Sequence, residues 1–400
     1  MKCLLITNYF PPTIGGSSKV YGNLYKYGKN KISVLTSTCD QKTGAMIRRD
    51  ANDNDSLYFV KYLQSPNIHC KNIFHSIWAL LRFDVPIQAI VFFKTISLIR
   101  KNRFDVICIG ELQIQGWLTI FLKLITNAKT ILFVHGEELS TVTTSRFFGK
   151  NAKLYLHRSD GIVSVSDFTK NMIIKNYGIS DNKIRLISNG IDLSEYHSIS
   201  QTDSVIQKYI KPGRVLIFGI GRLIARKGFD KAIEAINIVN KKGYNVHYVI
   251  AGLGDMYDLL CKKIEDLGLQ STVSLVGKLS HDELTAFYQG CDIFLMPNRE
   301  LENRDTEGFG LVFLEANAFK KPVIGGRYGG AVDAIIHEET GLLVDSKSAN
   351  EIADAIIKLV DDQTLRCAMG EKGYQWAQQN DIKIKVEEFL AYCETISNPE

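Results

Sequence analysis

The chain has 400 residues, of which 45% are hydrophobic and 23% are charged. This composition is typical of a folded globular protein and excludes the disordered, collagen-like and low-complexity classes. The length predicts two or three domains. No run of about 18 uninterrupted apolar residues occurs, so we expect no membrane-spanning helix. The first ten residues lack the length and cleavage site of a signal peptide and are interpreted as a strand.

The net charge of +5 is unevenly distributed along the chain. Residues 1–199 carry 25 Lys and Arg against 14 Asp and Glu, a net +11. The remaining residues carry 23 against 29, a net −6. The excess of positive charge in the first half predicts an anionic partner, which leaves nucleic acid, an anionic membrane surface and a phosphorylated substrate open.

The first half alternates apolar, strand-like segments with helix-like ones. Strands are predicted at residues 2–10, 31–37, 104–110, 129–136 and 160–166, and helices at 20–28 and 167–178. This alternation predicts parallel βαβ units in a doubly wound sheet. In such sheets the functional residues lie in loops at the carboxyl ends of the strands.

The second half repeats the pattern from about residue 200, after a polar join at residues 193–213. Strands are predicted at 214–221, 245–252, 272–277, 292–297, 322–326 and 340–345. Helices are predicted at 228–243, 256–268, 281–290, 310–321 and 348–362, with terminal helices at 374–396. We therefore expect two α/β domains facing each other across a cleft, an arrangement typical of a small ligand held between domains.

The sequence shows no convincing metal site. Eight cysteines occur without a Cys-x-x-Cys pair, which is typical of reduced, buried thiols in a cytoplasmic protein. Asp53, Asn54 and Asp55 match a metal-binding Asp-x-Asp pattern. They lie in a hydrophilic segment, not after a buried strand, and are interpreted as a solvated turn.

The strongest functional signal is EGFGLVFLEA, which places Glu307 and Glu315 eight positions apart. Gly308 and Gly310 permit close backbone approach, and the following helix start offers free amides to an anion. Eight helical positions span roughly 12 Å, so the two carboxylates cannot act on one atom. They suit the two ends of an elongated ligand such as a nucleotide diphosphate sugar. The alternative is a solvated Glu307 and a Glu315 in a surface ion pair.

A second signal is the strand-to-helix loop in FGIGRLIARKGFDKAIEA. The strand ends in Gly219 and Gly221, and Arg222 and Lys227 follow it. Two cations at this place suit a pyrophosphate, although surface cations in loops are common. A nicotinamide-binding GxGxxG motif would need a glycine at position 224, where Ile224 stands.

Two weaker signals lie in the first half. In NYFPPTIGGSSKVYGNL a first strand leads through Gly15 and Gly16 into a helix, a loop whose amides can reach an anionic or sugar ligand. His135 follows the apolar strand in ILFVHGEELS, where a polar side chain points into the ligand site. The alternative for His135 is a structural histidine with satisfied hydrogen bonds.

Together these segments resemble the retaining glycosyltransferase family 4, which has the GT-B fold and includes glycogen-synthase-like and bacterial cell-surface glycan enzymes. The resemblance covers nearly the whole chain. It rests on PPTIGG, FVHGEE, VSVSDFT, LISNGID, GRLIARKG, AGLGD, SLVGKLSHDEL, CDIFLMPN, EGFGLVFLEA, KPVIGGRYGGAVDAI and TGLLVD in that order. It implies two Rossmann-like domains facing a central cleft.

The resemblance also implies roles for individual residues. Arg222 and Lys227 would hold the departing diphosphate, Glu307 would accept from donor-sugar hydroxyls, and His135 would sit near the reacting sugar. Glu315 would hold the ribose. The implied donor-binding set is Gly15, Gly16, Gly221, Lys278, Leu279, Gly308, Phe309, Gly310, Leu311, Val312 and Glu315.

The resemblance assigns the acceptor to residues 1–198 and the nucleotide sugar to residues 199–375, with a terminal helix at 376–400 crossing back to the first domain. Asn189 and Asp192 would lie in the interdomain stretch. The long charged loop before Glu307 departs from the family, and so does the aromatic Phe319 at a usually small position.

The implied reaction moves a hexose or N-acetylhexosamine from a nucleotide diphosphate sugar to a glycan acceptor, with retention of configuration and no required metal. The resemblance implies base recognition largely through backbone, so the sequence barely encodes the choice between uracil and guanine. A UDP-sugar is favoured over a GDP-sugar on general frequency alone. The implied role is in cell-envelope polysaccharide biosynthesis, such as that of lipopolysaccharide.

The basic first half suggests where the acceptor lies. Residues 68–104 hold six cations, one acid and several aromatic residues, and residues 145–158 form a second such segment. Basic and apolar side chains together suit an anionic membrane, so we expect a lipid-linked or membrane-surface acceptor and peripheral attachment at the inner face of the cell membrane. The alternative is that the apolar residues are core and the cations a solvated face.

Three other functions remain open from sequence. A nucleotide-sugar epimerase or a phosphorylase can use the same fold, although a cofactor-binding lysine is not recognisable. A non-catalytic glycan-binding protein is the third. Nucleic-acid binding is not expected, because no RNA or DNA motif and no stacking pattern among the cations occurs.

Overall fold

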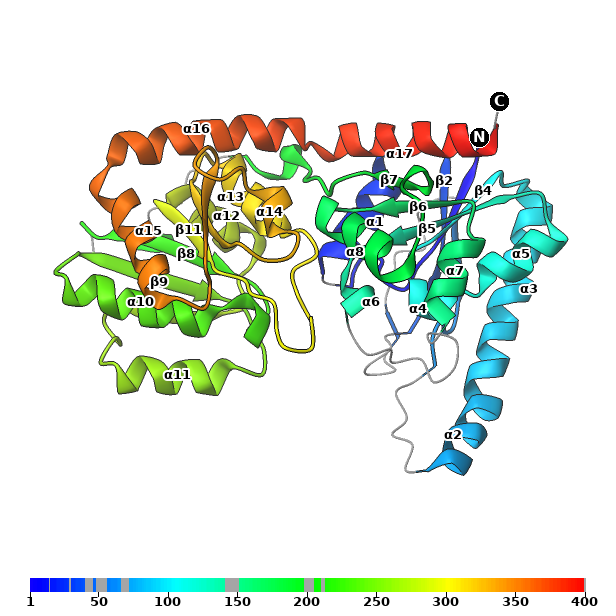
Figure 1. Ribbon diagram of the computed structural model, residues 1–400, viewed down its shortest axis with the longest axis horizontal. Helices are drawn as coiled ribbons and strands as arrows, with labels where there is room; N and C mark the ends of the chain where they lie inside the picture. The colour runs from blue at the N-terminus through cyan, green and yellow to red at the C-terminus, as the bar shows by residue number, and fades with distance from the viewer. Residues whose placement is uncertain are drawn as a thin grey trace. The chain divides into compact units, whose positions relative to one another are not determined.

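The computed structural model describes residues 1–13, 15–28, 30–39, 46–47, 56–65, 72–140, 151–197, 205–209 and 213–398. The chain divides into two compact units. Unit 1 comprises Met1–Ile187 and Lys383–Glu400, and unit 2 comprises Ser188–Ile382. Each is a parallel sheet flanked by helices (Figure 1).

Unit 1 is built on a seven-stranded parallel sheet in the order β3-β2-β1-β4-β5-β6-β7. The strands are β1 (Cys3–Ile6), β2 (Ile32–Ser37), β3 (Leu57–Val60), β4 (Val106–Ile109), β5 (Lys129–Val134), β6 (Gly161–Ser164) and β7 (Ile184–Leu186). The strand order reverses between β1 and β4, which makes their carboxyl ends the place where ligands bind in doubly wound sheets. The sequence did not predict β3 and β7, which are short edge strands.

The helices of unit 1 join successive strands. They are α1 (Gly16–Tyr27), α2 (Ile73–Ala79), a π-helical turn η1 (Leu80–Asp84), α3 (Val85–Asn102), α4 (Leu112–Gln115), α5 (Leu118–Ile125), α6 (Glu137–Ser140), α7 (Ala152–Arg158) and α8 (Asp167–Tyr177). Helix α8 shows why such segments form helices. Ser166 accepts from the Thr169 amide at its start, and Gly178 adopts the left-handed conformation at its end.

Unit 2 holds a six-stranded parallel sheet in the order β10-β9-β8-β11-β12-β13. Its strands are β8 (Val215–Ile220), β9 (Val246–Ala251), β10 (Val273–Gly277), β11 (Ile293–Met296), β12 (Val323–Gly326) and β13 (Gly341–Val344). Its helices are α10 (Phe229–Lys241), α11 (Tyr257–Asp266), α12 (His281–Gly290), α13 (Leu311–Ala318), α14 (Ala331–Ala334), α15 (Ala349–Asp361) and α16 (Gln363–Gln379). The predicted doubly wound α/β architecture is confirmed in both units.

The last helix, α17 (Ile382–Ser397), packs on unit 1. Phe389 is buried with its ring 6.0 Å from that of Phe133 on β5. Lys31 forms an ion pair with Glu394 at 3.0 Å. Unit 1 is therefore assembled from both ends of the described chain.

The helical segment Ile73–Asn102, which joins α2, η1 and α3, is long and apolar enough to cross a membrane by length and composition alone. Counting uninterrupted apolar residues did not reveal it. Its α3 part is nevertheless a core helix of unit 1, because Val91, Leu98 and Ile99 are buried in the core. Gln88 donates to the Leu63 carbonyl and accepts from the Trp117 indole.

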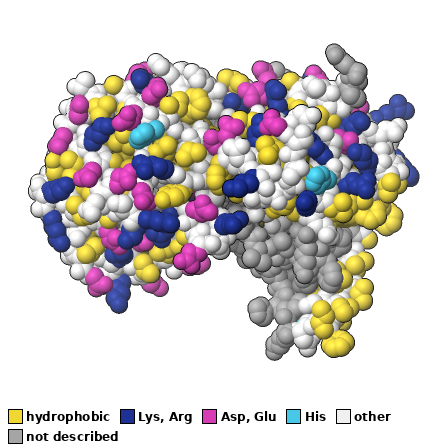
Figure 2. All heavy atoms as spheres, in the orientation of Figure 1, with side chains coloured by type: hydrophobic (Ala, Val, Ile, Leu, Met, Phe, Trp, Pro, Cys, Tyr) yellow, Lys and Arg dark blue, Asp and Glu magenta, His cyan; other side chains and the backbone are white. Residues whose placement is uncertain are grey.

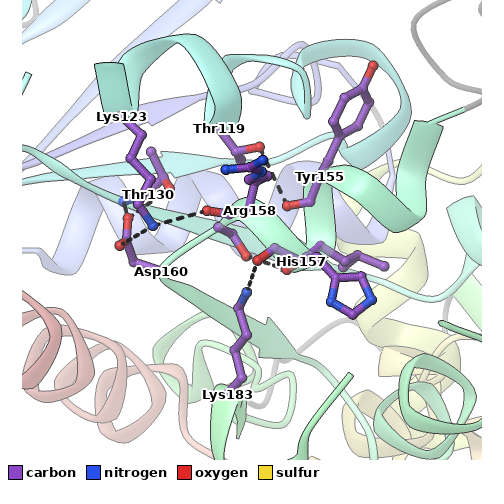
Figure 3. A network of polar contacts seen from close by, with 10 residues as sticks. Thr119, Lys123, Thr130, Tyr155, His157, Arg158, Asp160 and Lys183 are labelled. Carbon is purple, nitrogen blue, oxygen red and sulfur yellow. Dashed lines mark hydrogen bonds and ion pairs between the residues drawn. The ribbon is translucent and has the colours of Figure 1, made fainter. Parts of the chain in front are cut away.

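A polar network closes the amino-terminal edge of the unit 1 sheet (Figure 3). Asp160 accepts from the Thr130 amide at 2.9 Å, from the Thr130 hydroxyl at 3.0 Å and from Lys123 at 3.1 Å. Burial alone would raise the pKa of Asp160, but these donors and the charge of Lys123 lower it. Lys183 donates to the His157 carbonyl nearby. The network joins α5, β5, α7 and the turn η3 (Asp181–Lys183) before β7, at the edge away from the strands' carboxyl ends, and is structural.

Candidate functional site

In unit 2 a buried ion pair lies beyond the carboxyl end of β8. Lys227 ends the short turn η5 (Ala225–Lys227), and Glu307 lies in the loop before α13. The Lys227 Nζ lies 2.5 Å from the Glu307 Oε2, and the two side chains are only 11% and 13% exposed. The structure thus brings together two residues that the sequence placed 80 positions apart and interpreted separately.

A second cation, Arg226, was not found from the sequence. Its side chain is buried, and its Nη1 lies 3.8 Å from the Glu307 Oε2 and donates to the Thr306 carbonyl at 3.0 Å. Its Nε lies 3.7 Å from an Asp305 carboxylate oxygen. The signal was present in the Ala-Arg-Lys-Gly run, but sequence alone does not show that both of these adjacent cations are buried.

These charges keep Glu307 ionised. Burial would raise the pKa of Glu307, but the charges of Lys227, Arg226 and Arg222 and the Lys227 hydrogen bond together lower it. Three cations against the carboxylates of Glu307 and Asp305 leave local positive charge. Such a cluster suits an anionic group with hydroxyls that the ionised Glu307 can accept from.

Backbone packing sets the position of this loop. A Cβ on Gly330 would lie 1.9 Å from the Gly308 carbonyl oxygen, and the Gly330 amide donates to the Glu307 carbonyl at 2.7 Å. Gly310 has a left-handed φ of 92° and precedes α13 without a side-chain cap. The amides at the start of α13, at Leu311 and Val312, therefore lack a capping side chain, an arrangement that suits an anion.

Glu315 lies within α13 and is buried. Its Oε2 accepts from the Tyr288 hydroxyl at 2.7 Å, and it also accepts from the Tyr196 hydroxyl. Burial first, and Glu315 second, raise the pKa of both tyrosines well above its usual value. The role of Glu315 toward a ribose stays a prediction, and it requires a ribose hydroxyl to replace or join these donors.

The other predicted residues of unit 2 also follow strand ends. Gly221 comes directly after β8, and Lys278 and Leu279 come directly after β10. Lys278 is exposed, whereas Phe309, in the loop before α13, is buried. Their contacts with a ligand stay predictions.

In unit 1 the glycine pair lies at the start of α1. Gly15 precedes the helix without a side-chain cap, and a Cβ on it would meet nothing within 4 Å. Gly16 begins the helix. The space beside Gly15 is open, and the contact of this turn with a ligand stays a prediction.

His135 lies directly after β5 and packs on two aromatic rings, 5.1 Å from Tyr21 and 5.1 Å from Phe133 between ring centres. Its amide donates to Glu138 at 3.0 Å. Burial lowers the pKa of His135 to about 3, so the ring is neutral at pH 7. A neutral imidazole can hydrogen-bond a sugar but contributes no charge.

Sequence reasoning also missed Glu111, which lies after β4 and is only 5% exposed. Its Oε1 accepts from the Thr7 hydroxyl at 2.6 Å and from the Asn8 amide at 3.0 Å. Burial raises the pKa of Glu111 to about 7, with the hydrogen bonds from Thr7, Asn8 and Tyr9 acting in the opposite direction. No motif surrounds this residue, so only its place beyond a buried strand could have indicated it.

The remaining candidates from the sequence are Asn189, Asp192 and residues 53–55. Asn189 and Asp192 are buried near the start of unit 2, where Asp192 accepts from the Ser194 amide. Residues 53–55, interpreted as a solvated turn, lie outside the described residues. Within the described ranges, no group of three or more His, Cys, Asp and Glu side chains is arranged to hold a metal ion.

Two family models match the chain in succession. Residues 56–195 match the model described as Glycosyltransferase Family 4, and residues 201–376 match the model described as Glycosyl transferases group 1. The chain belongs to the family 4 glycosyltransferases. The predicted family is therefore confirmed by a match in each half of the chain, and the chain is a transferase.

Known relatives cover nearly the whole chain. It is 26% identical over 400 residues to the GDP-mannose-dependent alpha-(1-6)-phosphatidylinositol monomannoside mannosyltransferase of Mycobacterium tuberculosis, with 97% of this chain and 98% of that protein covered. It is 28% identical over 289 residues to the capsular polysaccharide biosynthesis glycosyltransferase CapM of Staphylococcus aureus, with 70% and 73% covered.

Solved structures share the fold. HepE from Anabaena in complex with UDP and glucose superposes with a TM-score of 0.74 at 17% identity, covering 99% of each chain. A glycosyltransferase from Rickettsia africae gives a TM-score of 0.75 at 19% identity, covering 100% of this chain and 99% of that one. The GT-B fold predicted for this family 4 member is confirmed.

The glycine after Lys227 provides a test of how the ion pair is positioned. Gly228 has a φ of 75°, and a Cβ on it would lie 1.9 Å from the Pro297 carbonyl oxygen. Gly243 has a φ of 88° but nothing within 4 Å. Gly243→Ala should cost about 1–2 kcal/mol from the left-handed backbone. Gly228→Ala should cost about 1–3 kcal/mol more because a backbone atom must move. Urea denaturation measures both, and equal losses would contradict the close packing.

The raised pKa of Glu111 predicts a pH-dependent stability. A carboxyl whose pKa is higher in the folded state lowers the free energy of unfolding as pH rises from 4.5 to about 7. Glu111→Gln removes this titration. The difference in unfolding free energy, variant minus wild type, should therefore be more positive at pH 8 than at pH 5 by about 2–3 kcal/mol. Glu265→Gln, at an exposed position on α11, is the control, and its difference in unfolding free energy from the wild type should be the same at both pH values. A difference for Glu111→Gln that does not change with pH would refute the raised pKa of Glu111.

Proposed function

We propose that this glycosyltransferase moves a hexose or N-acetylhexosamine from a nucleotide diphosphate sugar to a lipid-linked or membrane-surface glycan, with retention of anomeric configuration, in cell-envelope polysaccharide synthesis. The observation that carries the donor part is the buried Lys227–Glu307 pair, with Arg226 and Arg222 beside it. This cluster lies in the loops around β8 and α13, where a doubly wound sheet binds ligands.

The chemistry follows from the charges. As the diphosphate departs, negative charge grows on its oxygens, and Lys227 and Arg226 are already held in place to stabilise it. Arg222 is exposed but near enough for its charge to act on Glu307, and it would add to this stabilisation. The uncapped amides at the start of α13 add a positive dipole end. Glu307, ionised because its pKa is lowered, accepts hydrogen bonds from sugar hydroxyls and orients the reacting carbon.

The comparisons point to two different nucleotides for the donor. The structure of HepE holds UDP and glucose, which agrees with the UDP preference expected from sequence. The relative from Mycobacterium tuberculosis is named as GDP-mannose-dependent and is similar over the full length. The proposal therefore extends to both nucleotides, and a donor panel must include both.

Relatives support a cell-envelope acceptor. One is named for a phosphatidylinositol mannoside, a lipid-linked sugar, and CapM is named for capsular polysaccharide. A structural neighbour, WaaG, is named for lipopolysaccharide biosynthesis and superposes with a TM-score of 0.66. The names refer to a phosphatidylinositol mannoside, a capsular polysaccharide and a lipopolysaccharide, which supports a lipid-linked or envelope glycan as the acceptor here.

The outer face of the segment Ile73–Asn102 supports membrane attachment. Figure 2 shows apolar side chains gathered along it. Its exposed apolar residues are Ile73, Phe74, Ile77, Trp78, Leu81, Val85, Ile90 and Phe93. Helix α5 adds Phe121, Leu124 and Ile125, and the rings of Phe92 and Phe121 lie 6.1 Å apart. Helix α3 buries one face in the core of unit 1 and exposes the other, so only part of the apolar set expected from sequence is core.

The charged residues near these apolar side chains indicate the kind of membrane that the surface suits. The exposed cations on this helix and just after it are Arg82, Lys94, Arg100, Lys101 and Arg103, whereas its one acid, Asp84, is buried. Apolar side chains flanked by cations suit an anionic lipid surface. Residues 68–71 and 145–150, which belong to the two segments proposed from sequence, lie outside the described residues.

Replacing Glu307 tests the donor site. Glu307→Gln keeps the shape but removes the charge, so kcat/KM should fall on the order of 10²–10³-fold while the circular dichroism spectrum is unchanged. A thermal-shift panel of UDP- and GDP-sugars should show stabilisation of the wild type by one of them and a weaker shift for the variant. The exposed Glu302→Gln in the same loop is the control. Equal activity of Glu307→Gln would exclude Glu307 from the donor site.

Liposome flotation tests the membrane surface. The chain should float with vesicles containing phosphatidylglycerol at low salt, and less at high salt because exposed charges are screened. Phe74→Ser combined with Phe93→Ser, at positions 78% and 68% exposed, should reduce flotation several-fold. Leu259→Ser, at an exposed apolar position of unit 2, should not. No flotation of the wild type with anionic vesicles would remove this part of the proposal.

A further inference from the structure

Two tyrosine hydroxyls of unit 2 meet on the carboxylate of Glu315. Tyr288, on α12, donates to the Glu315 Oε2 at 2.7 Å, and Tyr196, near the start of unit 2, also donates to Glu315. Burial first, and the negative charge of Glu315 second, raise the pKa of both tyrosines well above its usual value, so both hydroxyls keep the protons that they donate. Glu315 is only 4% exposed, and a carboxylate this buried takes its direction from its donors.

Phe319 holds the two tyrosine rings. It follows Glu315 by four positions at the end of α13, so the two side chains lie on the same face of the helix. The Phe319 ring stacks on the Tyr288 ring with 6.1 Å between centres, and the Tyr196 ring meets it edge-on at 6.2 Å. Each tyrosine therefore packs its ring on Phe319 and donates its hydroxyl to Glu315. The aromatic residue that departs from the family at position 319 is part of the packing that orients this carboxylate.

The backbone that carries Tyr196 is itself held in place. The turn η4 (Leu193–Glu195) comes directly before it, and Asp192 caps this turn by accepting from one of its backbone amides at 3.1 Å. The Ile191 amide donates to the Asn380 carbonyl, just after α16, at 3.1 Å. Tyr196 thus reaches Glu315 from a segment that other contacts within unit 2 fix, and its hydroxyl is a donor of defined position.

The Glu315 carboxylate has the capacity to accept from a ligand as well. A carboxylate offers about four acceptor positions, and two hydroxyl donors use two of them. Glu315 lies four positions, roughly 6 Å along the helix axis, beyond Leu311, where the uncapped amides of α13 begin. A nucleoside diphosphate with its phosphates at those amides carries two adjacent ribose hydroxyls that can donate to Glu315. Both hydroxyls can be bound only when the carboxylate faces them, so its direction decides the strength of the contact.

We propose that Tyr196 is a positioning residue of the nucleotide site, whose hydroxyl holds the Glu315 carboxylate toward the ribose hydroxyls of the donor. Tyr288 adds the second hydrogen bond, and Phe319 packs on both rings. The inference rests on the proposed function for the contact between Glu315 and ribose. Selection of a ribonucleotide over a deoxyribonucleotide then depends on the tyrosine hydroxyl as well as on the carboxylate.

Ribose-selective binding separates this role from a merely structural one. Isothermal titration calorimetry with the full chain compares UDP and GDP with the deoxy forms that lack one ribose hydroxyl. The wild type should bind the tighter of the two ribonucleotides about 10–100-fold more strongly than one of its deoxy forms, as expected for a hydrogen bond to a charged acceptor. Tyr196→Phe keeps the ring and removes the hydroxyl, and it should lower this ratio by about 3–10-fold. A tyrosine that only stabilises the fold would leave the ratio unchanged.

A double-mutant cycle shows whether Tyr196 acts through Glu315. Glu315→Gln should remove most of the preference for the ribonucleotide, and Tyr196→Phe added to it should change the ratio no further. Tyr248→Phe is the matched control, because the Tyr248 hydroxyl is also buried in unit 2, where it donates to the Leu295 carbonyl at 3.0 Å. It should lower the midpoint of thermal unfolding and leave the ratio as in the wild type.

Several results would overturn the inference. These are an unchanged ratio in Tyr196→Phe, an equal loss in Tyr248→Phe, and tighter ribonucleotide binding in Tyr196→Phe, which would mean that the hydroxyl competes with ribose. A wild type that binds a ribonucleotide and its deoxy forms equally would overturn it too, because Glu315 would then not contact ribose. Failure of the proposed function would look different, since the wild type would bind neither UDP nor GDP and would release no nucleoside diphosphate from any donor.

Discussion

The arrangement of the loops after β8 and before α13 depends on one ion pair, that between Lys227 and Glu307. Taking two charges out of water is costly, and a buried pair of this kind contributes little net stability. The pair instead fixes the positions of the two side chains, because removal of either partner leaves the other as an uncompensated buried charge. The pair joins the loop after β8 to the loop before α13, so both approach a ligand as one unit.

Backbone contacts enforce this constraint from outside the pair. Gly228 follows Lys227 and touches the Pro297 carbonyl, and Gly330 touches the Gly308 carbonyl beside Glu307. Each contact excludes a side chain, so each loop has essentially one place to lie. At the carboxyl edge of the unit 1 sheet the loop after β1 is fixed by hydrogen bonds to the carboxylate of Glu111 and not by an ion pair.

Sequence periodicity predicted most strands of both sheets, because buried parallel strands are short apolar runs ending at glycine or polar residues. It also placed Glu307, Lys227 and His135 correctly in loops at strand ends. It could not show that Lys227 and Glu307 meet, since that contact is set by tertiary packing. Arg226 and Glu111 were missed because burial, not residue type, makes them notable. The helix at 73–102 escaped because apolar residues occupy both its faces, which erases the amphipathic period.

The return of α17 to unit 1 has a consequence for biosynthesis. The first seven strands leave the ribosome long before Phe389 and Cys393, which cover Phe133 on β5 and Cys3 on β1. Unit 2 is thus an insertion within unit 1. All of unit 2 is present in the nascent chain while unit 1 still lacks the helix α17 that packs on it. The order of synthesis and the order of completion are therefore reversed, and the amino-terminal sheet keeps an apolar face uncovered until α17 has been synthesised.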